Sequence, residues 1–300
     1  MKKILILVRK IDEENLKLKK LISKFAGADI EIEMKPFSEL IFEIEEGAIA
    51  VKISGEDIRE YDLVYIRTIS RTLAFVAGSL AYALEYLGVP YVNKRFTNVR
   101  AVNDKLTPLL ILAVNKFPII PAVFCSRENI SKNADYLVKK FGFPIVVKEV
   151  KKHHSQGIFV LRNKSDFSKL ISESKQEDQF LFQKFVPIES EYRLLVLGGS
   201  VKSVQKMYRD LDNFRAIIDY NRKEEFIGIN GVSSQMKEMA IKSAALLNMQ
   251  IVGVDTLIRS DNSKIQLLEL NSCPGLTYDT KISPEIPEIS KYLAKFASRE

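Results

Sequence analysis

Two apolar stretches between residues 251 and 276 flank a polar, turn-forming hexapeptide, and this pattern predicts a β-hairpin. If the turn is centred on Asn262, Asp255 lies directly opposite Glu269. Because side chains alternate along a strand, Asn271 lies on the same face as Glu269. The hairpin therefore brings two carboxylates and one amide together on one face of an otherwise apolar pair of strands.

These three side chains allow two interpretations. Carboxylates that face each other directly repel, and a bound hard cation would remove that cost. Carboxylate and amide oxygens are suitable ligands for Mg²⁺ or Mn²⁺. The same residues are equally compatible with a solvated polar face of the hairpin, which is the commoner situation, and the spacing alone leaves both interpretations open.

Length and composition indicate a sizeable core and two or three subdomains, since the chain has 300 residues, of which 46% are hydrophobic and 28% charged. The apolar run at the N-terminus is too short for a signal peptide. The most apolar later stretch, residues 109–124, contains Lys116, Pro118 and Pro121, so we expect no membrane span. Two cysteines far apart in the sequence fit a reducing cytoplasm.

The formal net charge of +7 indicates affinity for anions such as nucleic acid, nucleotide phosphates or acidic peptides. The only histidines, His153 and His154, are adjacent, which argues against a zinc site or a Ser-His-Asp triad assembled from separate segments. The sequence also lacks aromatic–basic interleaving, zinc knuckles and helix-turn-helix signatures, so no nucleic-acid partner is expected.

Strand and helix patterns alternate over the first third of the chain, which predicts a small α/β domain with a mainly parallel sheet. A polar, basic stretch over residues 93–103 links it to a second domain, and Pro187 marks a second joint. We therefore expect an α/β (α+β) chain with units at residues 1–95, 96–187 and 188–300.

Several cationic side chains are candidates for binding an anion. Lys148 ends an apolar strand pattern, P-I-V-V-K, and a buried ammonium group needs a partner. Lys105 begins an apolar helix, where a bound anion would offset its unfavourable interaction with the helix dipole. Arg193 and Arg215 match the geometry of a carboxylate or phosphate. Each is also compatible with an ordinary strand-edge or surface position. The loop at residues 151–157 contains one glycine and is a weak phosphate-loop signal.

The order of the motifs is more specific than any single one. P-I-V-V-K, F-L-F-Q-K-F, V-G-V-D and E-L-N-S-C-P-G-L follow one another in an arrangement that resembles the ATP-grasp superfamily. Within it, the sequence is most similar to RimK-type ligases, which add glutamate to a protein or small-molecule carboxylate. The resemblance is good over residues 104–277 and looser before them. It implies an ATP-grasp fold with an N-terminal α/β domain, a central lid domain and a C-terminal mixed-sheet domain that carries a metal site.

The resemblance also implies roles for individual residues. Asp255, Glu269 and Asn271 would hold the Mg²⁺ (or Mn²⁺) ions that bridge the phosphates of ATP. The remaining nucleotide contacts would fall to six residues: Lys105 and Lys148 at the phosphates, Gln183, Lys184 and Phe185 at adenine, and Glu191 at the ribose.

Three arginines would complete the site. Arg215 would meet the transferred phosphoryl group or the substrate carboxylate, Arg193 would support the same end of the site, and Arg67 would lie near the substrate. The implied reaction joins an amino acid, such as glutamate, to a carboxylate-bearing small molecule, peptide or protein C-terminus through an acylphosphate. It depends on positioning and charge neutralisation, and on a central domain that closes as a lid. The resemblance further implies a homodimer or homotetramer.

Two features differ from the family pattern. The loop after Lys148 is longer and poorer in glycine, and Arg215 is followed by Ala216 and Ile217 where RimK-type ligases commonly have small polar residues. The second difference puts glutamate as the added residue in question. Both suggest an alternative, an ATP-grasp-like nucleotide-binding regulatory protein without ligase activity, although the intact metal donors favour the ligase.

Overall fold

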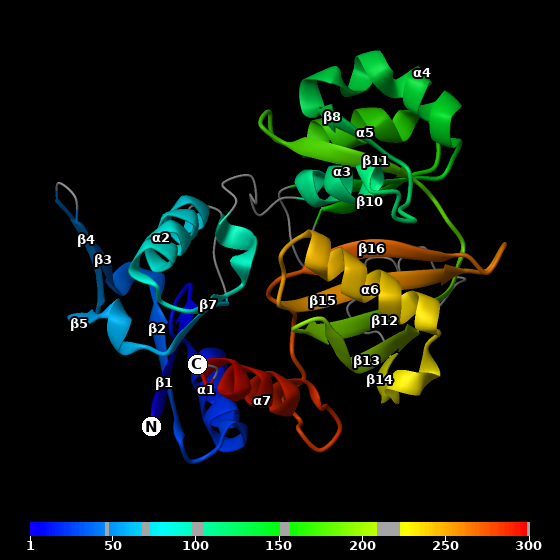
Figure 1. The fold of residues 1–300 in the computed structure, drawn as a ribbon. Helices are drawn as coiled ribbons and strands as arrows, with labels where there is room; N and C mark the ends of the chain where they lie inside the picture. The colour runs from blue at the N-terminus through cyan, green and yellow to red at the C-terminus, as the bar shows by residue number, and fades with distance from the viewer. Residues whose placement is uncertain (46–47, 68–72, 98–104, 151–156, 209–222, 299–300) are drawn as a thin grey trace.

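The computed structural model describes residues 1–45, 48–67, 73–97, 105–150, 157–208 and 223–298. Arg215, the pair Ala216–Ile217 and residues 151–156 lie outside these ranges, as does most of the stretch interpreted as the first link. The described chain forms three sheet-containing units and a small additional sheet (Figure 1).

The first unit contains a parallel sheet in the order β2–β1–β6–β7, as the sequence predicts. Its strands are β1 (Lys2–Val8), β2 (Ile30–Pro36), β6 (Leu63–Ile66) and β7 (Tyr91–Val92). Helix α1 (Glu13–Ala26) begins after Asp12, whose carboxylate accepts the backbone N–H of Asn15 at 3.0 Å, and α2 (Ala74–Leu87) ends at Gly88 in the left-handed conformation. Strands β3 (Leu40–Glu45), β4 (Ala48–Ile53) and β5 (Glu56–Asp57) form a separate antiparallel sheet.

The central unit contains an antiparallel sheet in the order β10–β9–β11–β8. Its strands are β8 (Ala122–Ser126), β9 (Ile145–Glu149), β10 (Ile158–Leu161) and β11 (Gln179–Lys184). Side chains on one face, including Val147, Phe180 and Phe182, pack in one core with residues of α4 (Ile130–Phe141) and α5 (Ser165–Glu173). Helix α3 (Leu106–Val114) precedes this sheet in the chain. The opposite face is therefore free to meet the rest of the molecule.

The C-terminal sheet has the order β14–β13–β12–β15–β16, and all its strand pairs are antiparallel. Its strands are β12 (Ile188–Leu197), β13 (Ser200–Tyr208), β14 (Lys223–Ile227), β15 (Ile251–Arg259) and β16 (Ile265–Asn271). The mixed character expected from the sequence comes from one parallel bridge, between Ile119 and Leu267. Helix α6 (Ser234–Leu246) lies across one face of the sheet (Figure 1).

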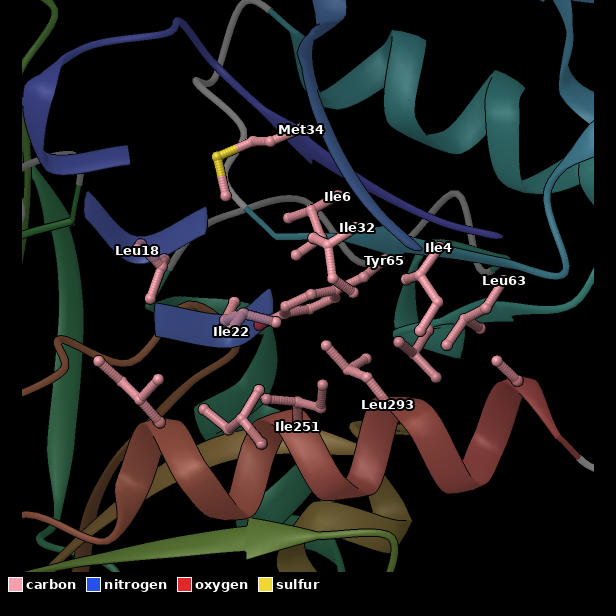
Figure 2. Close-up of a cluster of buried hydrophobic side chains, with 14 of the residues drawn as sticks. Ile4, Ile6, Leu18, Ile22, Ile32, Met34, Leu63, Tyr65, Ile251 and Leu293 are labelled. Atoms are coloured by element: carbon pink, nitrogen blue, oxygen red, sulfur yellow. The ribbon is translucent and has the colours of Figure 1, made fainter. Parts of the chain in front are cut away.

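The last helix, α7 (Glu285–Ala297), packs the C-terminal end of the chain against its N-terminal strand. Its buried residues Ile286, Ile289 and Leu293 share one core with Ile4 and Ile6 of β1. Figure 2 shows Leu293 pointing toward the side chains of β1, with Tyr65 of β6 and Ile251 of β15 in the same cluster. The closing helix therefore packs on the first unit, although it follows the C-terminal sheet in the sequence.

Within the described ranges, five short 3-10 helices complete the secondary structure: η1 (Phe37–Glu39), η2 (Ile58–Glu60), η4 (Lys94–Thr97), η5 (Arg127–Asn129) and η7 (Ile229–Gly231). Among the described residues, no helix combines the length and apolar character needed to cross a membrane.

Candidate active site

The β15–β16 hairpin has the predicted pairing, with Asp255 opposite Glu269. A β-bulge produces this register, because Thr256 pairs with Leu267 and Leu268 is the extra residue. Without the bulge, Leu268 would lie opposite Asp255, and alternation would turn Glu269 toward the α6 face. The bulge therefore aims both carboxylates at the open face of the sheet.

Asp255 is 7% exposed and already has two partners. Arg193, its neighbour across the strands, donates from Nε to Oδ1 at 2.7 Å and from Nη2 to Oδ2 at 2.9 Å. Asn271 Nδ2 donates to Asp255 Oδ2 at 3.2 Å, which leaves Asn271 Oδ1 for another partner. Glu269 is half-buried and makes no hydrogen bond or ion pair within the described part of the chain. The hairpin thus offers a paired carboxylate, an unengaged carboxylate and an amide oxygen.

The open face of the C-terminal sheet is strongly acidic. Glu191 lies on it two residues before Arg193, and Glu224 on β14 accepts a 2.7 Å hydrogen bond from Gln205 Nε2. The interaction with Asp255 raises the pKa of Arg193 above its ordinary value despite burial, and Glu224 and Glu191 contribute to the increase. One guanidinium thus faces several carboxylates, and this excess of negative charge favours a bound cation.

The central sheet contributes a second polar face. Lys148 on β9 lies opposite Leu181, and Gln183 on β11 lies opposite Val146, so Lys148 and Gln183 share the face turned away from α4 and α5. Gln183 is 6% exposed and Lys148 is half-buried. Lys184, the last residue of β11, is exposed. The structure therefore places together two of the predicted nucleotide residues.

The remaining central residues lie where the chain enters and leaves the unit. Lys105 is half-buried and directly precedes α3, as predicted, and Phe185 is half-buried just after β11. Both belong to the connections between the central unit and the rest of the chain.

A small apolar cluster joins the two polar faces. Leu257 of β15 packs with Ile120 and Val186, and Leu268, the bulge residue, packs against the same group. Leu267 N donates to Pro118 O at 2.8 Å, which holds the entry segment along β16. Leu268 is partly exposed, whereas Leu257, Ile120 and Val186 are buried, so the cluster presents mainly Leu268 beside the acidic face. Sequence reasoning did not identify it; the signal available was the apolar alternation that places Leu257 on the same face as Asp255.

Arg67 lies at the carboxyl end of β6 in the first unit and is 8% exposed. Cys273, then Tyr65 and then Tyr278 interact electrostatically with it, and Cys273 and Tyr278 lie on the segment that follows β16. Asn93 and Arg95 hold the same segment. Asn93 Nδ2 donates to Ser272 O at 3.4 Å, and Arg95 Nη1 donates to Ser272 Oγ at 2.8 Å. The sequence predicted a linker here, whereas these two buried residues fix the segment beside the hairpin donors.

Comparison with known proteins identifies the family. Residues 102–288 match the RimK-like ATP-grasp domain. The chain belongs to this family. The match contains every described nucleotide and metal candidate, whereas Arg67 lies before it. ATP-grasp ligases use ATP and Mg²⁺, in agreement with the donor types on the hairpin.

Individual relatives agree with this ATP-grasp assignment. The β-citrylglutamate synthase B of Homo sapiens is 26% identical over 258 residues, covering 82% of this chain and 64% of the relative, so under two-thirds of that protein is matched. A D-alanine–D-alanine ligase from Buchnera aphidicola is 25% identical over 257 residues, covering 78% and 80%. The ATP-grasp ligase PsnB, solved with a phosphomimetic variant of its minimal precursor, Mg and ADP, has a TM-score of 0.70 at 15% identity over 98% of each chain. The last likeness shows the ATP-grasp fold.

Proposed function

We propose that the chain is an ATP-dependent carboxylate–amine ligase that forms an amide bond through an acylphosphate. The observation that supports this most directly is the donor set on the β15–β16 hairpin. Glu269 has no partner within the described residues, and it faces Asp255 on an acidic sheet face of a RimK-like ATP-grasp domain. The relatives described above, a synthase, a ligase and an ATP-grasp ligase of similar fold, agree with this chemistry.

The hairpin donors fit a hard cation. The described residues contain no group of three His, Cys, Asp or Glu side chains arranged for a metal, and the amide of Asn271 supplies the third donor here. Carboxylate and amide oxygens suit Mg²⁺, and Mn²⁺ is compatible with the same set. Asp255, Glu269 and Asn271 would hold the ion, which when bound offsets negative charge on the ATP phosphates. Arg193 would keep the Asp255 carboxylate in place.

The nucleotide would lie between the two polar faces. Lys105 and Lys148 would contact the phosphates, and Gln183, Lys184 and Phe185 would present the polar edge for adenine. Glu191 would accept hydrogen bonds from the ribose hydroxyls. The partly exposed side chain of Leu268, supported by the buried Leu257, offers an apolar contact for the aromatic base, whose polar contacts lie at its edge.

The proposed reaction has two steps. A substrate carboxylate attacks the γ-phosphorus of ATP, the bond to the bridging oxygen breaks, and an acylphosphate and ADP form. An amine then attacks the acyl carbon, phosphate leaves, and the nitrogen loses a proton as the amide forms. We assign Arg215 to the transferred phosphoryl group or the substrate carboxylate. The substrates would be an amino acid, glutamate or a similar one, and a carboxylate-bearing small molecule, peptide or protein C-terminus.

A substrate panel tests the proposal. The protein is incubated with ATP, Mg²⁺, and pairwise combinations of amino acids and carboxylic acids or acidic peptides, and phosphate release and product mass are measured. We expect phosphate release that requires both substrates, and a product equal in mass to acid plus amine minus water. ATP binding without turnover on a broad panel would support the alternative, a nucleotide-binding regulatory protein without ligase activity. No contact among the described residues favours that alternative.

A further inference from the structure

The first sheet contains a topological switch point. From β1 the chain passes to β2 on one side, and β6 pairs with β1 on the other. In open parallel sheets, ligands bind outside the carboxyl ends of the strands at such a point. Arg67 directly follows β6, and its backbone N–H donates to Leu7 O near the end of β1 at 3.1 Å. The Arg67 side chain is therefore attached at the edge of the sheet where ligands bind in folds of this type.

Within the described residues, the Arg67 side chain has no carboxylate counter-ion of the kind that a buried guanidinium requires. It is 8% exposed, and its one side-chain hydrogen bond within the described residues runs from Nη1 to Tyr65 OH at 3.5 Å, the outer limit for such a bond. No described carboxylate forms an ion pair with it. Arg193 provides the contrast, because its fork is filled by Asp255. Five N–H donors with one weak partner leave Arg67 able to bind an anion.

The two tyrosines beside Arg67 do not neutralise it. Tyr65 and Tyr278 both have raised pKa values, that of Tyr278 reaching about 12 because burial and Glu14 disfavour its ionised form, so both phenols are uncharged at neutral pH. Tyr278 OH donates to Glu14 Oε1 at 3.1 Å, which fixes the segment carrying Cys273 against α1. Burial lowers the pKa of Arg67, but the interaction with Cys273, followed by those with Tyr65 and Tyr278, more than compensates and raises it, so the guanidinium stays charged.

The position of Cys273 connects Arg67 to the acidic face. Cys273 is two residues after Asn271, and two residues of chain span at most about 7 Å. We propose that Arg67 and Cys273 line a subsite for a substrate carboxylate that does not itself react. We assign the non-reacting role because a guanidinium fork that binds both oxygens occupies part of their lone pairs and lowers the nucleophilicity of the carboxylate. This inference rests on the proposed ligase function.

Two substrates could supply such a carboxylate: a diacid acceptor through its second carboxylate, or an amino-acid donor through its α-carboxylate.

Cys273 is a built-in reporter of occupancy, because it is half-buried whereas Cys125, the other cysteine, is buried. The rate at which N-ethylmaleimide alkylates Cys273 can be followed by peptide mass spectrometry. The probes are glutarate and citrate as amine-free acids, glycine and L-glutamate as amino acids, and glutaramide as the neutral control.

We expect at least one of the carboxylates to slow alkylation of Cys273 by about tenfold at a concentration ten times its Kd, and glutaramide to have no effect. Protection by glutarate or citrate identifies the acceptor as the source, and protection by the amino acids alone identifies the donor. Arg67→Gln should abolish protection, and Arg67→Lys, which keeps the charge without the fork, should retain part of it. The shift in melting temperature caused by ATP and Mg²⁺ should remain in both variants, which shows that they are folded.

The inference is overturned if none of the four carboxylates protects Cys273 in protein that binds ATP with Mg²⁺, or if protection persists in Arg67→Gln. Failure of the proposed function looks different, because the wild-type protein would then show no Mg²⁺-dependent ATP binding or turnover. The two results are read from separate measurements.

Discussion

Asp255 and Glu269 face each other across two strands, yet their surroundings differ. The fork of Arg193 holds Asp255, whereas the carboxylate of Glu269 makes no hydrogen bond or ion pair within the described ranges. Glu269 therefore keeps both oxygens available for a cation. Its loss should affect ligand-dependent behaviour most and the unliganded fold least.

Glu269→Gln removes one negative charge and preserves the side-chain shape. We expect Mg²⁺-dependent turnover to fall by at least about a hundredfold, because the metal loses a charge-neutralising donor. The urea midpoint without nucleotide should not change, since no bond is lost. Glu238→Gln, which removes an exposed ion pair with Lys242 on α6, is the control and should change neither quantity. Unchanged turnover in Glu269→Gln would exclude this carboxylate as a metal ligand.

Arg193→Met leaves the largely buried Asp255 carboxylate without its cation. We expect the free energy of unfolding to fall by about 2–3 kcal/mol in the absence of metal, less than for a fully buried pair because the Arg193 side chain is 26% exposed. ATP with Mg²⁺ should restore more stability in the variant than in the wild-type protein, because the ion takes over the neutralising role. Urea denaturation with and without ATP and Mg²⁺ measures both, and an equal loss in the two conditions would contradict this account.

The pairing of Asp255 with Glu269 could be predicted because a hairpin is local and its alternation is visible in the sequence. The partner of Arg193 could not, since it depends on two strands that are adjacent in the sheet but 62 residues apart in the chain. The same holds for Asn93, which reaches Ile251 and Ser272 across more than 150 residues. Residue types indicated the chemistry here, but tertiary packing decided the contacts.

At the scale of elements, helices and apolar strands followed the sequence closely. Ser233 caps α6 as its position predicts, with Oγ accepting Met236 N at 3.2 Å, and Gly198–Gly199 form the two-residue turn between β12 and β13 with positive φ. Strand β14 has no clear strand pattern in the sequence, because K-E-E-F-I is mostly polar; it lies at the sheet edge, where one side can stay solvated. The bulge at Leu268 has no sequence signal, because no glycine marks it.

A charge network ties three strands of the first unit together. Lys3 of β1 and Lys35 of β2 both pair with Glu33 and Glu56, and Tyr61 OH lies 2.7 and 2.8 Å from the two glutamates, to either of which it can donate its one proton. Each cation and each carboxylate thus has more than one partner. The network holds the small β3–β4–β5 sheet against the parallel sheet.

Glu56 gives this network a pH dependence. Hydrogen bonds from Lys35, Tyr61 and Lys3 lower the pKa of Glu56 from 4.5 to about 2. A lowered folded-state pKa means that the stabilisation is complete above about pH 4.5 and is lost as the pH falls toward 2. Over this window the stability of Glu56→Gln should fall less steeply than that of the wild-type protein in urea titrations. Glu60→Gln, at an exposed site without a hydrogen bond or ion pair among the described residues, should follow the wild-type slope.

At the scale of the molecule, we propose that all three units contribute to the candidate site. The central unit would supply Lys148 and Gln183, the C-terminal sheet the acids, and the first unit Arg67. We propose the division at residues 1–95, 96–187 and 188–300, with α7 packed on the first unit although it belongs to the last in sequence.

Residues 96–300 alone should therefore not behave as an independent domain. Without the first unit, Ile286, Ile289 and Leu293 lose their packing partners, and each exposed aliphatic side chain costs about 1.5–3 kcal/mol. We expect this fragment to aggregate on gel filtration under conditions in which the full chain remains dispersed. A dispersed fragment that binds ATP with Mg²⁺ would show that the first unit is dispensable for folding.

Three consecutive residues at the end of the hairpin, Asn271 to Cys273, each interact with a different part of the molecule. Asn271 reaches Asp255, Ser272 is bound by Asn93 and Arg95, and Cys273 interacts electrostatically with Arg67. If the proposed subsite is occupied by a substrate that shifts Cys273, the same tripeptide would shift at Asn271, and substrate affinity and ATP affinity would be linked. Thermodynamic reciprocity then requires that if a bound acid tightens ATP by a given factor, ATP tightens the acid by the same factor.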